Sequence, residues 1–161
     1  MKELELDDRF TCDEVVHQWE ENLVSFLLEV TILPGAIEFI HFVCQNFPNL
    51  PQAIATSSYS SSVAQKRKHK PDLFKYMKVV VCGDDKDIRL GKLNLDIFLV
   101  TSERLQVNPG RCLVFEDSLS GVQAASWANM KMVAIPDARL DPSTFEAYAS
   151  EIISSFNSIR F

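Results

Sequence analysis

Four short apolar, β-favouring runs mark the chain from residue 52 onward, and segments with helical periodicity separate them. The runs cover residues 52–56, 77–82, 112–115 and 132–135. None alternates apolar with polar residues, which predicts strands buried on both faces, as in a parallel sheet. Helical patterns lie between consecutive runs, over residues 60–68, 96–105 and 118–129. This order predicts an α/β fold, a Rossmann-like parallel sheet with flanking helices and right-handed crossovers.

Three further helices are expected outside this alternation. Pro34 stands at the favoured first position of a helix whose apolar stripe precedes the first strand. Thr11 followed by Glu14 predicts a capping box at the start of a long amphipathic helix that runs to Val30. The residues of its apolar stripe are interpreted as packing residues. Residues 143–156 predict a terminal helix.

Composition narrows the class of protein. The chain has 161 residues, 47% of them hydrophobic, which suits one globular domain with a substantial core. A net charge of −6 argues against a general nucleic-acid binder, which needs basic groups for phosphates. One basic cluster, residues 66–70, closes a predicted helix and is interpreted as a solvated turn that complements the helix dipole.

Cysteine spacing and hydropathy bear on the compartment. The four cysteines form no CxxC pair, which predicts a reducing environment. No apolar run approaches the roughly 18 residues of a membrane span, and the N-terminal residues are too acidic for a signal peptide. We therefore expect a cytoplasmic protein without membrane partners.

Polar side chains follow each predicted strand. Thr56 and Ser57 follow the first strand, and Glu116 and Asp117 follow the third. The carboxyl ends of parallel strands share one edge of a sheet, where ligands bind. Paired carboxylates are typical Mg²⁺ ligands, whereas hydroxyls and amides near a helix start suit a phosphate. The alternative for each acid alone is helix capping, because Asp117 or Ser118 could cap the next helix.

Lys92 supplies the opposite charge. It stands in the segment GKLNLDIF, just before the helix pattern that starts at residue 96. Its ammonium could neutralise phosphate and carboxylate charge at the same edge. A single lysine in a loop is usually solvated, so this interpretation depends on the other strand ends.

These segments, in this order, resemble the haloacid dehalogenase-like (HAD) hydrolase superfamily. The similarity covers residues 6–137 and rests on IATSS, GKLNLDIF and EDSLSGVQAA. Together with ILPGAIEFI and VVVCGDDKDIRLGK, the chain is most similar to the subgroup of pseudouridine-5'-phosphatase and β-phosphoglucomutase-like enzymes. The resemblance implies that Thr56 binds phosphate, that Lys92 stabilises the transferring phosphoryl group, and that Glu116 and Asp117 hold Mg²⁺. Asn129 replaces a common glycine and can adopt the same left-handed helix end.

The family's first strand ends in DxDGT, which supplies the nucleophile and the general acid, and the 161 residues contain no such segment. The resemblance thus predicts a HAD core over residues 33–161 without its central strand, and a remnant of the helical cap over residues 1–32. The strands ending at Thr56 and Glu116 would then face a gap. They could pair with each other, accept a segment of another chain or self-associate through open edges, or remain strained.

Three functions are compatible with this reading. The family activity is Mg²⁺-dependent hydrolysis of small phosphorylated metabolites, such as a nucleoside or sugar phosphate, through an aspartyl-phosphate. Without a nucleophile the chain is expected to be inactive by itself, so a non-catalytic fragment that binds or dimerises is the alternative. A receiver-like phosphoacceptor domain is a third option, but its acidic pair should follow the first strand.

Overall fold

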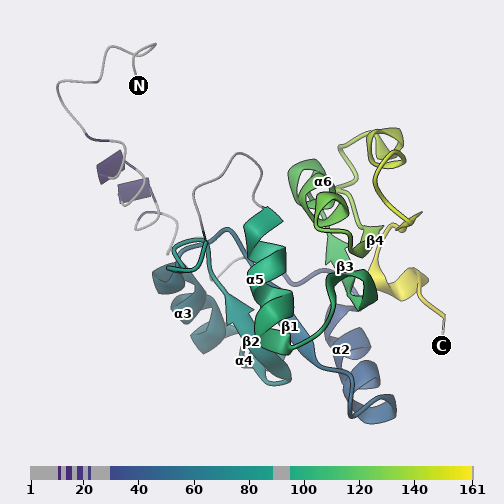
Figure 1. Ribbon diagram of the computed structural model, residues 1–161, viewed down its shortest axis with the longest axis horizontal. Helices are drawn as coiled ribbons and strands as arrows, with labels where there is room; N and C mark the ends of the chain where they lie inside the picture. The colour runs from purple at the N-terminus through teal and green to yellow at the C-terminus, as the bar shows by residue number, and fades with distance from the viewer. Residues whose placement is uncertain are drawn as a thin grey trace.

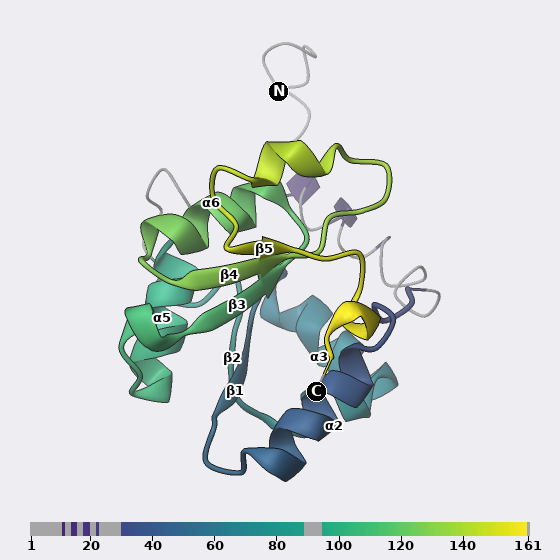
Figure 2. The same cartoon turned by 90° about the vertical axis from the view of Figure 1, so that its right-hand side faces the viewer.

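The computed structural model describes residues 30–88 and 95–160, together with Thr11, residues 14–15 and 18–19, and Asn22. Within these residues the strands form two separate sheets, and every pairing is parallel (Figures 1 and 2). The first sheet pairs β1 (Gln52–Ala55) with β2 (Met77–Val81). The second has the order β3 (Leu113–Glu116), β4 (Lys131–Ala134) and β5 (Glu151–Ile152). The predicted α/β class with parallel strands is confirmed.

Helices flank both sheets. They are α2 (Ala36–Asn46), α3 (Ser60–His69), α4 (Pro71–Phe74), α5 (Leu95–Leu105) and α6 (Leu119–Trp127). In Figure 2, α5 and α6 lie on one side of the strands, and α2 and α3 lie on the other. The predicted helices between strands are thus confirmed within one or two residues at each end. The short helix α4 was not expected.

Two backbone features set helix ends. Gly35 precedes α2 with a φ of 81°, a left-handed conformation that glycine adopts without steric cost. Pro34 therefore lies in the turn before the helix rather than in its first position. Asn129 follows α6 with a φ of 60°, which confirms the prediction that asparagine provides the left-handed helix end here.

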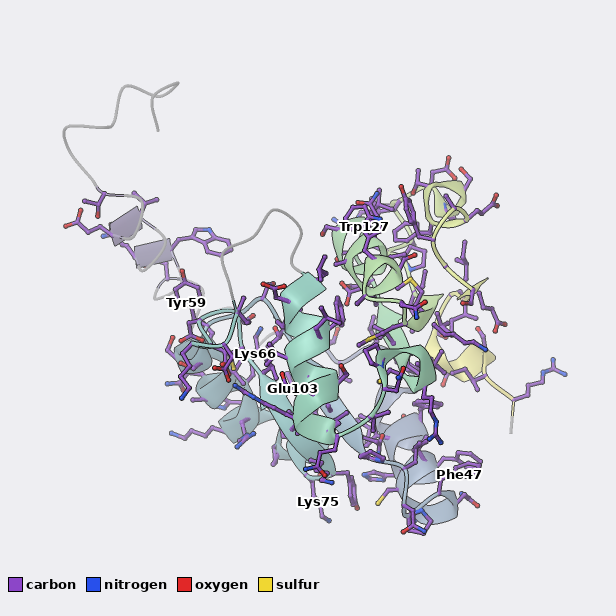
Figure 3. The ribbon with its side chains drawn as sticks, in the orientation of Figure 1. Phe47, Tyr59, Lys66, Lys75, Glu103 and Trp127 are labelled. Atoms are coloured by element: carbon purple, nitrogen blue, oxygen red, sulfur yellow. The ribbon has the colours of Figure 1, made fainter. Side chains whose placement is uncertain are left out.

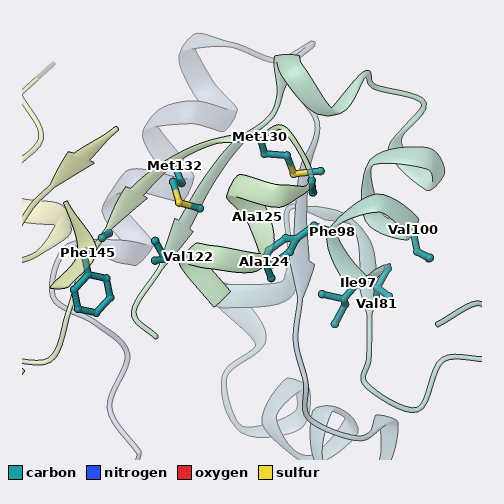
Figure 4. Close-up of a cluster of buried hydrophobic side chains, with 12 residues drawn as sticks. Val81, Ile97, Phe98, Val100, Val122, Ala124, Ala125, Met130, Met132 and Phe145 are labelled. Atoms are coloured by element: carbon teal, nitrogen blue, oxygen red, sulfur yellow. The ribbon is translucent and has the colours of Figure 1, made fainter. Parts of the chain in front are cut away.

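The core lies between α5, α6 and the strands that they cover (Figure 4). Val81 of β2, Val122 of α6 and Met132 of β4 are fully buried, and so is Phe145 in a 3₁₀ turn near the C-terminus. Because α5 packs against β1 and β2 and also contacts α6, it joins the two sheets on this side.

The central edges of the two sheets do not pair. Among the described residues, β1 is hydrogen-bonded to β2 and β3 to β4, so β1 and β3 do not pair directly with each other. Figure 2 shows the two sheets splayed apart. β4 has partners on both sides, and Met132, Val133 and Ala134 are buried; β1 and β3 have no buried residue. The prediction of strands buried on both faces is therefore wrong for β1 and β3, because each lacks one neighbouring strand.

An aromatic cluster joins the two halves on the α2 side. Phe39 of α2 lies edge-on to Phe115 of β3 with ring centroids 4.9 Å apart, and Phe156 lies 5.3 Å and 5.1 Å from these two rings. Asn157 also lies directly against Gly35, where an added Cβ would collide with it. The C-terminal segment therefore fastens α2 to the second sheet.

The predicted terminal helix over residues 143–156 is wrong. This region forms a 3₁₀ turn over Pro142–Phe145, strand β5 and a second 3₁₀ turn over Phe156–Ser158. Ser150 and Ile153 donate their amides to the carbonyls of Met132 and Ala134. The open edge of β4 therefore satisfies its backbone groups through β5, and this tertiary pairing overrides the helical spacing of the apolar residues.

The N-terminal capping box is confirmed. The Thr11 hydroxyl accepts from the Glu14 amide at 3.2 Å, and the Glu14 carboxylate accepts from the Thr11 amide at 2.8 Å. Val15 and Trp19 are exposed, so packing of the apolar stripe is wrong for these two. Most of residues 1–29, and so most of the predicted cap remnant, lies outside the described residues.

Two observations bear on the compartment prediction. No helix in the described part of the chain is both long and apolar enough to cross a bilayer. Cys44, Cys82 and Cys112 are free thiols. Neither observation tests the cytoplasmic prediction itself.

Candidate functional site at the strand ends

The acidic pair at the end of β3 is built into the start of α6. Ser118 caps the helix, because its Oγ accepts from the Gly121 amide at 3.1 Å. The same hydroxyl donates to Glu116 Oε1 at 2.6 Å. Capping and carboxylate positioning are therefore done by one residue. Of the two capping alternatives, Ser118 and not Asp117 fills the role.

The environments of the two acids differ. Glu116 is half-buried and Asp117 is exposed. Burial raises the pKa of Glu116; the hydrogen bond from Ser118 acts in the opposite direction, and the neighbouring Asp117 charge raises the pKa further. A bound cation would offset the cost of burying the Glu116 carboxylate and would reduce its repulsion with Asp117. The pair therefore suits a divalent ion. Mg²⁺ commonly binds one or two protein carboxylates together with water and a substrate phosphate.

The described residues contain no group of three or more side chains of His, Cys, Asp and Glu placed to share a metal. A site here would therefore depend on Glu116 and Asp117 for its protein carboxylates, within the described ranges. This number fits Mg²⁺, which retains several waters, better than an all-protein cage.

The loop after β1 brings hydroxyls and amides together. The Ser58 amide donates to Thr56 Oγ1 at 3.2 Å, and the Ser58 carbonyl accepts from the Gly83 amide at 2.9 Å. Ser57 is exposed, and in the described part of the chain its amide and hydroxyl have no hydrogen-bond partner. Ser57 is therefore available to an incoming anion.

Gly83, after β2, allows this loop to pack closely. A Cβ at position 83 would collide with the Ser57 carbonyl oxygen and would lie 3.2 Å from the Ser57 Cα. These neighbours are backbone atoms and cannot rotate away. Gly83 thus allows the Thr56–Ser58 loop to pack directly against the residues that follow β2.

The start of α3 already holds a carboxylate. Asp84 accepts from the Ser60 amide at 2.8 Å and from the Ser60 hydroxyl at 2.6 Å. These bonds lower the pKa of Asp84, the hydroxyl more than the amide. Asp84 therefore occupies the first amide of the helix, and a phosphate cannot bind there without displacing it. Thr56, Ser57 and Ser58 remain as the groups that could bind a phosphate at this end of the sheet.

Asp85 and Asp87 are paired with a cation of α5. Arg104 donates to both oxygens of Asp85, at 2.6 and 2.7 Å, and to Asp87 at 2.6 Å. These bonds lower the pKa of Asp85 and raise that of Arg104. The network anchors the loop after β2 to α5, and Arg104 offsets one of the two negative charges of these acids.

Two groups thus stand at the strand ends, one on each sheet. Thr56 and Ser57 lie with Gly83 and Asp84 on the first sheet, and Glu116 and Asp117 lie on the second. Within the described ranges, no hydrogen bond or ion pair joins the groups. Lys92, the predicted third element of the site, lies outside the described residues.

Two hollows in the described part of the chain lie away from these groups. One of about 380 Å³ is lined by residues at the start of β1 and β2, including Leu50, Gln52 and Tyr76. The other, of about 590 Å³, lies beside Asp87 and Arg104. Thr56 and Glu116 are not among the residues that line these two hollows.

The family model of haloacid dehalogenase-like hydrolases matches residues 1–129. The chain is 35% identical over 146 residues to a probable pseudouridine-5'-phosphatase of Drosophila melanogaster, covering 89% of this chain and 62% of that protein. It is 33% identical over 141 residues to mitochondrial (DL)-glycerol-3-phosphatase 1 of Arabidopsis thaliana, covering 86% of this chain and 47% of that protein.

Solved structures agree with the fold. A putative β-phosphoglucomutase from Thermotoga maritima has a TM-score of 0.65 and 34% identity, over 74% of this chain and 54% of that one. A HAD hydrolase of family IA, variant 3, from Entamoeba histolytica has a TM-score of 0.78 and 25% identity, over 94% of this chain and 70% of that one.

The chain spans roughly half to two thirds of the curated relatives that it matches, 47% and 62% for the two named above. The family match itself extends across both strand-end groups, from the N-terminus through the acidic pair of β3 to the left-handed Asn129. This chain belongs to the haloacid dehalogenase-like hydrolases.

Proposed function

We propose that this chain carries the phosphate-binding and Mg²⁺-binding parts of a phosphatase site for small phosphorylated metabolites, such as a nucleoside or sugar phosphate, in the cytoplasm. Residues 33–161 would form the core and residues 1–32 part of a cap. The observation that carries the proposal is the half-buried Glu116 beside Asp117, held by Ser118 and raised in pKa. A carboxylate pair in this setting favours a cation.

The proposed role of each group in the site follows from its charge. Bound Mg²⁺ would neutralise negative charge on the carboxylates and on the phosphate. Thr56 and Ser57 would donate hydrogen bonds to phosphate oxygens, and Lys92 would contribute a positive charge. This role of Lys92 rests on the sequence motif.

Catalytic turnover would need groups in addition to those that bind phosphate and Mg²⁺. HAD phosphatases attack phosphorus with an aspartate of DxDGT, which the 161 residues do not contain. Without nucleophile and general acid, the remaining groups should bind phosphate rather than hydrolyse esters. We therefore propose that the chain alone is a binding module without phosphatase activity.

Calorimetry tests the binding part. Titration of Mg²⁺ in the presence of inorganic phosphate should release or absorb heat with the wild-type chain, and Glu116→Gln should remove most of that signal. Glu103→Gln is the matched control, because Glu103 is an exposed glutamate of α5 outside the site. Equal Mg²⁺ uptake by wild type and Glu116→Gln would refute the proposed metal site.

An aryl phosphate assay tests the catalytic part. The wild-type chain with Mg²⁺ should show no turnover above background. Turnover that Lys92→Ala abolishes would show that the chain is an enzyme by itself.

The open strands favour a second candidate, a dimerising module. β1 and β3 each expose one hydrogen-bonding edge of mainly apolar residues, and such edges pair readily with other strands. Sedimentation should then show concentration-dependent association that Leu113→Lys weakens, since Leu113 of β3 is 56% exposed. A monomer at all concentrations would rule this candidate out.

A further inference from the structure

Lys66 behaves differently from the rest of the basic cluster at the end of α3. Its Nζ donates to Ser58 Oγ at 2.8 Å, and the residue is half-buried. Figure 3 labels Lys66 among the side chains drawn on the ribbon. Arg67 instead lies over the Phe74 ring at 5.4 Å, and Lys68 is exposed. The interpretation of the whole cluster as a solvated turn is therefore wrong for Lys66.

Helix geometry explains the reach of Lys66. Side chains of an α-helix lean toward its N-terminus, so a lysine in the second turn of α3 extends back toward the preceding loop. Its partner Ser58 is also bonded to Thr56 and to Gly83. The ammonium of Lys66 therefore contacts Ser58, the last residue of the proposed phosphate-binding loop.

No described carboxylate neutralises Lys66. The nearby acids have other partners, since Asp84 binds Ser60 and Asp85 binds Arg104. Among the described residues, the ion pairs do not include Lys66. Lys66 Nζ thus has a neutral hydroxyl as its hydrogen-bond partner among the described residues, and its remaining N–H donors are available to an anion.

The charge of Lys66 is also felt at the end of β2. Burial, followed by Asp84 and Asp85, raises the pKa of the Cys82 thiol, while Arg67 and Lys66 act in the opposite direction. The effect of Lys66 at Cys82 is the smallest of these five.

We propose that Lys66 is a further phosphate-binding residue, whose ammonium contacts an oxygen of the phosphate held by Thr56, Ser57 and Ser58. This inference rests on the proposed function and adds a residue to its phosphate-binding loop.

The test uses the complete chain, inorganic phosphate and Mg²⁺. Lys66→Gln keeps a donor for Ser58 but removes the charge, and Lys68→Gln removes one charge from the same helix at an exposed position. We expect Lys66→Gln to weaken phosphate binding about tenfold or more, the value of a charged hydrogen bond. Lys68→Gln should change affinity less than about twofold, and Lys66→Arg should retain most of it.

The outcomes separate this inference from the proposed function. Phosphate binding that Thr56→Ala abolishes but Lys66→Gln leaves unchanged overturns the role of Lys66 alone. An equal loss in Lys66→Gln and Lys68→Gln also overturns it, because the effect would then be general electrostatics. A wild-type chain that binds no phosphate overturns both proposals.

A second measurement needs no variant. Acetylation of the wild-type chain, followed by mass spectrometry, reports the reactivity of each lysine. Inorganic phosphate with Mg²⁺ should protect Lys66 and leave Lys68 unchanged, whereas equal labelling of Lys66 with and without phosphate contradicts the proposal.

Discussion

The carboxylate of Glu116 occupies the volume that a side chain at position 121 would need. A Cβ added to Gly121 would collide with Oε1 and Cδ of Glu116 and would lie 2.6 Å from its Cγ. The glycine of EDSLSGVQAA therefore leaves room for the acid of the same motif. The spacing of five residues brings strand end and first helical turn together around this carboxylate.

Gly121→Ala should reduce Mg²⁺ binding strongly while it reduces the stability of the fold only slightly. The new methyl group displaces the Glu116 carboxylate, which can rotate, so we expect a stability loss of only about 1 kcal/mol. The increase in Tm that Mg²⁺ and phosphate give the wild type should be lost. Gly110→Ala is the control, because its Cβ would meet Asn108 at an ordinary 3.4 Å. A normal Mg²⁺-dependent shift in Gly121→Ala would argue against Glu116 as a ligand.

Gly83→Ala should cost more stability. Its Cβ meets the backbone of Ser57, which moves only with the whole loop, so urea unfolding should show a loss of about 1–3 kcal/mol. Phosphate affinity should fall as well, since the Thr56–Ser58 loop is displaced. Unchanged stability and affinity would show that the loop is not fixed by this contact.

Asp84→Ala should weaken the fold in a pH-dependent way. The pKa of Asp84 is lowered mainly by the Ser60 hydroxyl, so its stabilisation is complete above the ordinary carboxyl pKa and is lost as the pH falls through the lowered value. At pH 7 we expect a loss of about 1 kcal/mol, as for a helix cap. The difference from wild type should shrink below about pH 4 in urea titrations.

Asp137→Ala is the control for that pH series. Arg139 holds the pKa of Asp137 at about 2, yet both side chains are exposed. Screening by water makes such pairs nearly neutral for stability. A pH-dependent loss as large as that of Asp84→Ala would mean that exposed charge, and not the α3 cap, is responsible.

Phe156→Ala should loosen the joint between the two sheets. Phe156 contacts both Phe39 and Phe115, so truncation removes two ring contacts and should lower the unfolding free energy by about 1–3 kcal/mol. Phe47→Ala removes one edge contact with Phe42 from a ring that is 53% exposed and should have a smaller effect. Equal effects in thermal unfolding would contradict a joining role for Phe156.

Apolar, β-favouring runs predicted four of the five described strands, and helical periodicity predicted the helices between them. The sequence pattern failed where tertiary pairing decides, because β5 follows from the free edge of β4 and not from its own two residues. It also overestimated the burial of β1 and β3. The apolar content of a strand indicates what it can bury, whereas the number of its neighbours determines what is buried.

The sequence placed Glu116, Asp117, Thr56 and Ser57 at the ends of strands, and the structure agrees with that placement. Their roles in binding Mg²⁺ and phosphate stay predictions. The contact of Lys66 with Ser58 was missed, although a lysine eight residues after a serine, two turns into a helix, carried the signal. Gly83 contacts the loop after β1, and Arg104 binds the loop after β2. Both contacts join different elements, so sequence spacing does not predict them.

The aromatic joint depends on residues that are far apart in the sequence. Phe156 lies more than forty residues after Phe115 and is synthesised after both Phe39 and Phe115. The residues of β1 to β4 are therefore synthesised before the ring that fastens α2 to the second sheet. Contacts between such distant residues raise the contact order of a fold, and a higher contact order slows folding.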